Sequence, residues 1–325
     1  MNRRELLGAA AAAATFTSGA ARAQERYPSR PVTVVSPFAP GGQSDGVGRI
    51  VTAHLQRALG QPFVIENRTG AGGTIGAQYV ARANPDGHTL LFGTTGVFVI
   101  APYVYRNAGY EVPGSLVPVA MTAEVPVVMA ASKRSGFASV ADVVAAARRR
   151  PGEITFGSGG VGSFPQLMGE QFGALAGIRL THVPYRGGAP ALNDLVAGQV
   201  DLLFDGLSTV GPNVEAGRVT ALLTTGGGGR AFIPGVQTAL GAGMPDLDLT
   251  SWNGVLAPAR TPVPILDALN REINAALAAP EAREVMARLG VIPLGGGRDA
   301  MAERVEREAA IYRRIITTAE ITAEG

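Results

Sequence analysis

Apolar residues along the chain alternate between short continuous runs and sets with helical spacing. Runs at 31–38, 63–66 and 89–93 are rich in Val, Ile, Leu and Phe, which is typical of buried strands. Between the first two runs, apolar residues recur every three or four positions over 47–59, and Gly60 ends this predicted helix. Strands that alternate with helices predict an α/β fold with mostly parallel sheets.

The alternation continues to the C-terminus and divides into two units. Further strands are predicted at 117–123, 126–131, 154–157, 178–184, 202–205, 219–224 and 249–257. Further helices are predicted at 140–150, 163–176, 189–197, 209–216, 265–278, 281–289 and 299–319. We expect domain 1 to combine 24–124 with 226–325 and domain 2 to hold 125–225, with hinges near 122–125 and 224–229.

The first 23 residues have the features of a secretory signal peptide. Two arginines in Met1–Arg4 precede an alanine-rich apolar run, and Ala21-Arg22-Ala23 is a small-residue cleavage signal. We therefore expect a mature chain that begins at Gln24 and lies in the periplasm. The adjacent Arg3 and Arg4 fit both twin-arginine and Sec export.

Charge and cysteine content exclude several classes of function. The predicted signal carries three arginines and one glutamate, so its removal takes the formal net charge from +2 to zero. A neutral chain with no basic tract beyond 148–150 argues against nucleic acid as a partner. The chain has no cysteine, which excludes disulfides, thiol catalysis and cysteine-ligated metals.

A glycine-rich loop follows the first strand. Gly42-Gln43-Ser44-Asp45-Gly46 matches the G-x-S-x-G pattern of a serine nucleophile. His54 would lie about 15 Å along the next helix, and the order serine, acid, histidine of such hydrolases is missing. We favour a backbone turn in which Ser44 or Asp45 caps a helix that begins near Gly46, leaving N–H groups for an anion. An ordinary glycine turn fits the same letters.

A second glycine-rich loop follows the strand at 154–157. Gly157-Ser158-Gly159-Gly160-Val161-Gly162 matches the dinucleotide pattern G-x-G-x-x-G. That pattern also needs an acidic residue at the end of the next strand, but the chain has His182-Val183-Pro184-Tyr185-Arg186 there. We therefore expect no nucleotide cofactor, and no His, Asp and Glu cluster has metal spacing.

Two strand–helix loops of this kind, one in each unit, could hold a small carboxylate between them. The ends of other predicted strands, Thr94-Thr95 and Asp205, fall at equivalent positions, where α/β sheets bind ligands. Asp205 could accept a hydrogen bond from a ligand amine or hydroxyl, or cap the helix that follows. Phe38 and Tyr185 adjoin the loops and could flank a ligand, whereas His182 and Trp252 are expected to have structural roles in strands.

Three stretches together resemble a known family. They are "YPSRPVTVVSPFAPGGQSDGVGR" at 27–49, "VIENRTGAGGTIGAQYVARANPDGHTLLFGTTG" at 64–96 and "ITFGSGGVGSFPQLMGEQFGALAGIRLTHVPYRGGAPALNDLVAGQVDLLFD" at 154–205. The chain is similar to the Bug/TctC extracytoplasmic solute receptors of tripartite tricarboxylate transporters. Two positions depart from the family pattern: Gln166 stands where histidine is frequent, and Ala101 where asparagine is common before proline.

The resemblance implies a type II periplasmic-binding-protein fold, with two α/β domains around a ligand cleft. It also implies that backbone N–H groups and ordered water hold a carboxylate at 40–45 and 158–163. With the residues above, the expected ligand-binding set is Phe38, Pro40, Gly41, Gly42, Ser44, Asp45, Thr94, Thr95, Ser158, Gly159, Gly162, Ser163, Tyr185 and Asp205.

The resulting hypothesis is a monomeric receptor, without enzymatic activity, that delivers a small carboxylate to membrane permease subunits. Neither loop contains Lys or Arg; Arg49 lies one turn into the first helix and Arg186 just after a strand. This favours a monocarboxylate, dicarboxylate, amino acid or aromatic acid over a tricarboxylate. Two alternatives remain, an exported serine hydrolase that uses Ser44 and a ligand-sensing receptor for a signalling kinase.

Overall fold

Two six-stranded sheets form the framework of the computed structural model, which describes residues 27–323. The predicted signal peptide and the start at Gln24 lie outside these residues. The first sheet has the order β12-β4-β11-β3-β1-β2 and comprises β1 (Val32–Ser36), β2 (Phe63–Asn67), β3 (Thr89–Thr94), β4 (Leu116–Val125), β11 (Ser251–Pro258) and β12 (Ile292–Pro293). The second has the order β10-β9-β5-β8-β6-β7 and comprises β5 (Val127–Ser132), β6 (Thr155–Ser158), β7 (Thr181–Pro184), β8 (Leu202–Gly206), β9 (Val219–Thr224) and β10 (Gln237–Thr238).

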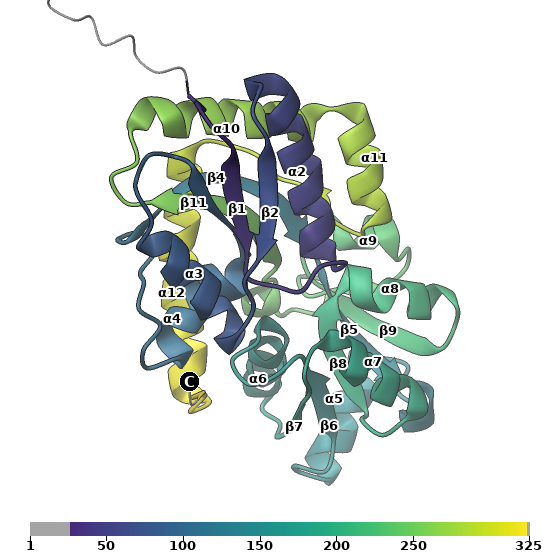
Figure 1. The fold of residues 1–325 in the computed structure, drawn as a ribbon. Helices are drawn as coiled ribbons and strands as arrows, with labels where there is room; N and C mark the ends of the chain where they lie inside the picture. The colour runs from purple at the N-terminus through teal and green to yellow at the C-terminus, as the bar shows by residue number, and fades with distance from the viewer. Residues whose placement is uncertain (1–26, 324–325) are drawn as a thin grey trace, which may run out of the picture.

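Each sheet with its helices makes one lobe, and Figure 1 shows the two lobes one above the other. The helices are α2 (Gln43–Leu59), α3 (Thr74–Ala81), α4 (Ala101–Val104), α5 (Val140–Arg149), α6 (Phe164–Ala176), α7 (Gly188–Ala197), α8 (Leu207–Glu215), α9 (Gly229–Phe232), α10 (Val263–Ala278), α11 (Pro280–Arg288) and α12 (Arg298–Thr318). The α/β prediction is confirmed, with antiparallel exceptions: β11 runs against β3 and β4, and β5 runs against β8 and β9.

The starts of two helices test the capping predictions. Ser163 caps α6, as predicted, because its hydroxyl accepts a hydrogen bond from the Gln166 N–H, and Gly177 ends that helix with a φ of 61°. The prediction for α2 is wrong: the helix begins at Gln43 with Gly42 as its N-cap, so neither Ser44 nor Asp45 caps it. Gly41, with a φ of 90°, makes the turn early enough for the helix to include both side chains.

The chain passes from the first sheet to the second at Pro126 and returns between β10 and β11, and the residue that follows β9 lies beside the first crossing. Only Pro126 separates β4 from β5. The Val127 N–H donates to Thr225 Oγ1 at 3.1 Å, and the Thr225 N–H donates to the Val127 carbonyl at 2.9 Å. β10 pairs with β9, so Gln237 and Thr238 belong to the second sheet although they lie beyond the predicted boundary at 225/226. The full division into domains stays a prediction.

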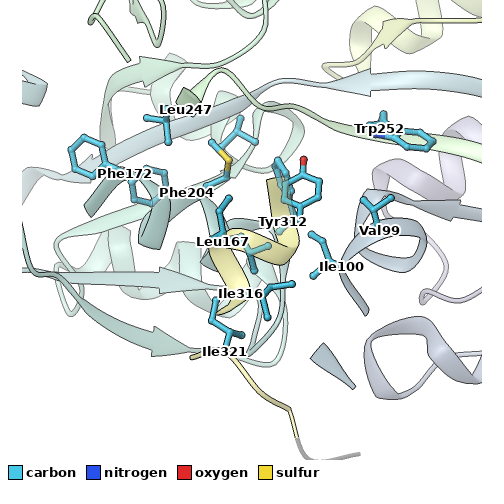
Figure 2. Packing of buried hydrophobic residues seen from close by; sticks show 14 of the residues in the cluster. Val99, Ile100, Leu167, Phe172, Phe204, Leu247, Trp252, Tyr312, Ile316 and Ile321 are labelled. Atoms are coloured by element: carbon cyan, nitrogen blue, oxygen red, sulfur yellow. The ribbon is translucent and has the colours of Figure 1, made fainter. Parts of the chain in front are cut away.

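The largest buried cluster includes side chains from both lobes, and α12 lies at its centre (Figure 2). Tyr312 and Ile316 of α12 share this cluster with Leu167 of α6. The rings of Phe164 and Tyr312 meet edge to face, with centroids 5.9 Å apart. Since α12 also packs on β4 of the first lobe, it forms a wall common to both lobes.

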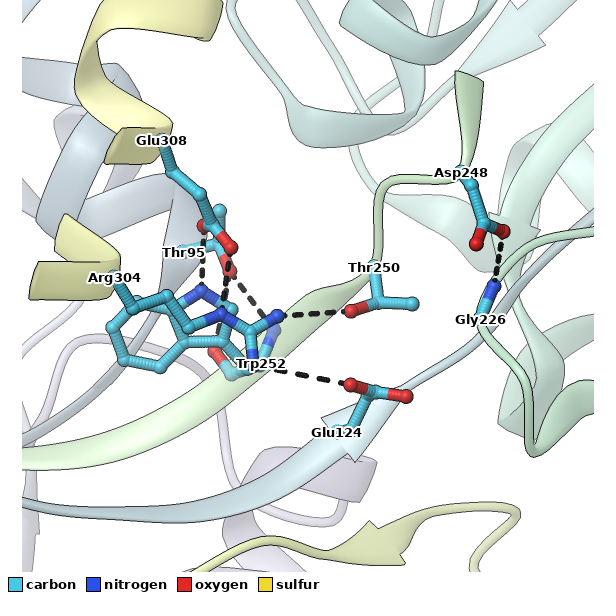
Figure 3. Close-up of polar contacts among 8 residues, drawn as sticks. All are labelled: Thr95, Glu124, Gly226, Asp248, Thr250, Trp252, Arg304 and Glu308. Atoms are coloured by element: carbon cyan, nitrogen blue, oxygen red, sulfur yellow. Dashed lines mark hydrogen bonds and ion pairs between the residues drawn. The ribbon is translucent and has the colours of Figure 1, made fainter. Parts of the chain in front are cut away.

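A buried polar network joins α12 to the crossing segments (Figure 3). Arg304 donates to Glu308 Oε1 at 2.6 Å and to Thr250 Oγ1 at 3.0 Å, and its Nη1 lies 3.8 Å from Glu124 Oε2. Glu124 lies near the end of β4, and Thr250 directly precedes β11. The network therefore fixes both crossing segments to one helix. Trp252 lies within it and is fully buried, as expected for a structural strand residue.

Candidate functional site

The N-terminus of α2 presents uncapped backbone N–H groups at the carboxyl edge of the first sheet. Gly42, the N-cap, forms no side-chain capping bond, and a Cβ added to Gly41 or Gly42 would meet no atom within 4 Å. The first-turn N–H groups of a helix point outward and carry the positive end of the helix dipole. With open space beside them, they make a site for an anion.

Asp45 stabilises this turn from inside the helix. Its Oδ2 accepts hydrogen bonds from Arg49 Nε at 2.8 Å and from the Gly41 N–H at 3.1 Å. The bond from Arg49 is the main reason that the pKa of Asp45 lies below its usual value. The carboxylate is therefore ionised and holds the loop in shape, while the exposed Arg49 offsets its negative charge.

Two amide side chains that the sequence prediction missed connect this turn to the sheet. Gln43 Nε2 donates to Asn253 Oδ1 at 2.6 Å. Asn253 is fully buried on β11 and pairs with Thr94 of β3, so the start of α2 lies close to the end of β3. Thr95 is buried too, and its hydroxyl accepts a hydrogen bond from the Trp252 N–H at 2.8 Å. Thr95 thus joins the end of β3 to β11 beneath the site.

Ser44 has no partner that would activate it as a nucleophile. Its Oγ is buried and forms no hydrogen bond within the described part of the chain. The nearest histidine in sequence, His54, lies with its Nε2 3.6 Å from Glu272 Oε2. The arrangement that a serine hydrolase needs, with a base in contact with the nucleophile, is therefore not formed at Ser44 in residues 27–323.

Several donors of the loop after β6 form hydrogen bonds to residues in or next to that loop. Ser158 Oγ bonds to both the N–H and the carbonyl of Gly160, at 3.2 and 3.1 Å, and lies 2.6 Å from His182 Nε2. The Gly162 N–H donates to Gln166 Oε1 at 2.7 Å. Among the described residues, the N–H groups of Gly159 and Val161 have no protein acceptor. Within 158–163 the N–H groups free for a ligand are therefore those of Gly159 and Val161, since the others described here have protein acceptors.

Asp205 lies at the end of β8 and faces the start of α7. Its Oδ2 lies so close to Gly188 that a side chain at 188 would collide with it, and Gly188 N in turn lies near Gly159. Burial raises the pKa of Asp205 to about 6. The N-cap of α8 is Gly206, so the alternative in which Asp205 caps that helix is wrong. Its Oδ1 accepts a hydrogen bond from the Gly206 N–H at 2.7 Å, and acceptance from a ligand stays a prediction.

The two aromatic residues predicted to flank a ligand have other contacts. Tyr185 donates its hydroxyl to Asp194 Oδ2 at 2.7 Å, which directs the ring towards α7. Phe38 is half-buried against the largest core cluster, and its carbonyl accepts from Asn67 Nδ2 at 2.8 Å. Neither contact tests whether these side chains touch a ligand, so their role stays a prediction.

The helix N-termini of the two lobes meet at the turn that ends α11. Leu289 contacts Gly46 of α2 so closely that its Cδ1 would lie 2.9 Å from an added Cβ. Gly290 lies against the first turn of α8, where an added Cβ would be 3.2 Å from Ser208 N. On the second glycine loop, Gly162 contacts Val104 of the first lobe. Both predicted loops therefore lie next to the boundary between the lobes.

Residues 27–323 contain neither a metal-ligand cluster nor a membrane-spanning helix. No group of three or more His, Asp or Glu side chains in this range could hold a metal ion. Every helix over the same range is too short or too polar to span a bilayer.

Comparison with known proteins agrees with the geometry. The family model described as "Tripartite tricarboxylate transporter family receptor" (TctC) matches residues 47–321. A UPF0065 protein from the tcbD–tcbE intergenic region of Pseudomonas sp. strain P51 is 37% identical, with 99% of this chain and 96% of that protein aligned.

Two solved structures are similar over nearly their whole length. A Rhodopseudomonas palustris protein with adipate superposes with a TM-score of 0.82 at 37% identity, covering 91% of this chain and 99% of that one. MatC from the same organism, with bound malate, gives 0.79 at 33% identity, covering 89% and 100%. The chain therefore belongs to the TctC (Bug) family of periplasmic solute-binding receptors.

Proposed function

We propose that the protein captures one small monocarboxylate or dicarboxylate between its two lobes and presents it to the membrane permease subunits of a tripartite tricarboxylate transporter. The observation that carries this proposal is the uncapped N-terminus of α2, which adjoins open space at the boundary between the lobes. The adipate and malate bound by two relatives support the same ligand chemistry.

The proposed binding set keeps the residues expected from the sequence and adds three. Backbone N–H groups of the first turn of α2, within the loop at 40–45, and those of Gly159 and Val161 would donate to the carboxylate, and the residues around them would shape the site. The set is Phe38, Pro40, Gly41, Gly42, Ser44, Asp45, Thr94, Thr95, Ser158, Gly159, Gly162, Ser163, Tyr185 and Asp205, together with Gln43, Asn253 and His182.

Charge supports the choice of ligand class. Asp45 is ionised, and its charge is paired with that of Arg49, one turn further along α2. The turn offers backbone donors but no unpaired cation. It can therefore hold one carboxylate group, whereas the three close carboxylates of a tricarboxylate would leave negative charge uncompensated. Binding favours the closed arrangement of the lobes through the contacts that the ligand makes with both.

A thermal-shift screen tests the proposal. Purified mature protein is heated with monocarboxylates, dicarboxylates, citrate, amino acids and aromatic acids at millimolar concentration. We expect at least one monocarboxylate or dicarboxylate to raise the melting temperature, and titration to give one site per chain. No shift with any acid would contradict the proposal. Labelling of Ser44 by a fluorophosphonate would support the hydrolase instead.

A further inference from the structure

We propose that His182 is a positioning residue for ligand capture, because its imidazole fixes the Ser158 hydroxyl and, through it, the backbone of 158–160. This inference rests on the proposed function, in which that loop receives a carboxylate. The sequence prediction assigned His182 only a structural place in a strand.

The hydrogen bonds of Ser158 Oγ account for its full bonding capacity. A hydroxyl has one proton to donate and two lone pairs that accept. Ser158 Oγ accepts from the Gly160 N–H at 3.2 Å and can donate to the Gly160 carbonyl at 3.1 Å. The remaining lone pair faces His182 Nε2 at 2.6 Å. All three contacts are hydrogen bonds at once when the imidazole proton lies on Nε2, and we assign this tautomer, in which His182 donates and Ser158 accepts.

The backbone that this contact holds has a conformation that glycine adopts readily and other residues rarely do. Gly160 has a φ of 130°, and an added Cβ would lie 3.2 Å from the Tyr185 carbonyl oxygen. The Tyr185 N–H donates to the Ser158 carbonyl at 3.0 Å, which fixes the other side of the turn. Next to this turn lie the N–H groups of Gly159 and Val161, which have no acceptor in residues 27–323. Holding the turn therefore keeps these two donors in place.

A Ser–His pair also suggests nucleophilic catalysis, and the surroundings argue against it. Ser158 is fully buried, and its hydroxyl lies within hydrogen-bond distance of the Gly160 carbonyl, a second acceptor for its proton. No carboxylate forms an ion pair with His182 within residues 27–323, so the third member of a triad is missing there. Burial lowers the pKa of His182 to about 4, which keeps the ring neutral near pH 7. The contact therefore positions the loop.

Binding measurements on four variants test the role, with adipate and malate as probes. His182→Phe removes the donor, and we expect it to weaken binding about ten-fold, as for the loss of one hydrogen bond worth roughly 1.4 kcal/mol. His182→Gln can still donate to Ser158 and should stay within about two-fold of the unmodified protein. Ser158→Ala should match His182→Phe, and the double variant should bind no more weakly than either single one.

A control separates positioning from a loss of stability. His88→Phe changes another buried histidine, one that contacts Asp86 and the Tyr27 ring outside both loops. His88→Phe should lower the melting temperature and leave the affinity for both acids unchanged. Amide hydrogen exchange at 159–161 should rise in His182→Phe and stay low in His88→Phe. Equal affinities for His182→Phe and the unmodified protein, or additive losses in the double variant, would overturn the inference. If the unmodified protein binds neither acid nor any other in the screen, the proposed function itself fails.

Discussion

The indole of Trp252 and the carboxylate of Glu308 form a buried hydrogen bond, from Nε1 to Oε2, of 2.7 Å. Arg304 completes the arrangement: its guanidinium lies 5.3 Å from the Trp252 ring centroid and donates to the other carboxylate oxygen of Glu308. Because Arg304 also contacts Glu124 and Thr250, the two crossing segments depend on a side chain of α12 (Figure 3).

Removing Arg304 should therefore destabilise the protein strongly. In Arg304→Met the buried Glu308 carboxylate loses its cation, and we expect the free energy of unfolding to fall by about 3 kcal/mol at neutral pH. Burial already raises the pKa of Glu308, and loss of the cation raises it further. Protonation should therefore reduce the deficit as the pH falls. Urea denaturation at neutral and mildly acidic pH measures both effects.

A second substitution serves as the control for that prediction. Adding Glu308→Gln to Arg304→Met removes the unpaired charge and keeps an acceptor for the Trp252 indole, so most of the lost stability should return. Surface substitutions typically change the free energy of unfolding by less than about 0.5 kcal/mol. A loss that small in Arg304→Met would show that the buried network contributes little to stability.

Tyr312 should tolerate loss of its hydroxyl but not of its ring. The side chain is fully buried, and its hydroxyl has no partner in the described part of the chain. Tyr312→Phe should leave the free energy of unfolding unchanged or raise it by up to about 1 kcal/mol. Tyr312→Ala should lower it by about 3–5 kcal/mol, because the cavity opens between α12 and α6. A clear loss of stability in Tyr312→Phe would show that the hydroxyl has a partner.

A methyl group at Gly42 should weaken binding without affecting the fold. The φ of Gly42 is −80°, and an added Cβ meets no atom within 4 Å, so Gly42→Ala should change the melting temperature little. The methyl would occupy space beside the α2 donors and should lower carboxylate affinity about ten-fold or more. Gly227→Ala, also with open space around it, is the matched control and should bind normally. Equal affinity in both variants would argue against the α2 site.

His182 and Asp205 should affect the pH dependence of stability in opposite directions. Burial lowers the pKa of His182 to about 4 and raises that of Asp205 to about 6. Between about pH 6.5 and 4 the unfolded chain carries a proton on His182 that the folded chain lacks, so acidification costs stability. For Asp205 the folded chain carries the extra proton between about pH 6 and 4, so acidification adds stability.

Single variants separate the two contributions. His182→Gln should lose less stability than the unmodified protein between pH 7 and about pH 5, and Asp205→Asn should lose more. Both replacements can keep their local hydrogen bonds, to Ser158 and to the Gly206 N–H. Urea midpoints across this range give the comparison, and slopes that change in the same direction for both variants would contradict it.

The sequence predicted most strands and helices because their apolar spacing is regular, and it placed Ser158, Thr94 and Asp205 at strand ends. It missed the helical residues of 96–104, where the side chains of 97–100 have a strand-like composition but are buried in the core. The starts of helices were less predictable, since glycine geometry at Gly41 and Gly42 moved the start of α2.

Contacts between distant parts of the chain gave no local signal. Gln43 and Asn253 are 210 positions apart, and no sequence motif links the two positions. His182 and Ser158 come together through parallel pairing of β6 with β7, whose strands were both predicted but whose register was not. Arg304 looks like one of many charged residues on an amphipathic helix, and only the packing of α12 brings it to Glu124 and Thr250, its partners outside that helix.

A crystal structure with the best acid from the screen tests the central claim most directly. We predict that one carboxylate group lies between the loops at 40–45 and 158–163, with an oxygen about 3 Å from the first-turn N–H groups of α2. The acid bound elsewhere, such as in the surface groove lined by Arg30, Tyr79 and Arg82, with the α2 turn contacting only solvent, would contradict the claim.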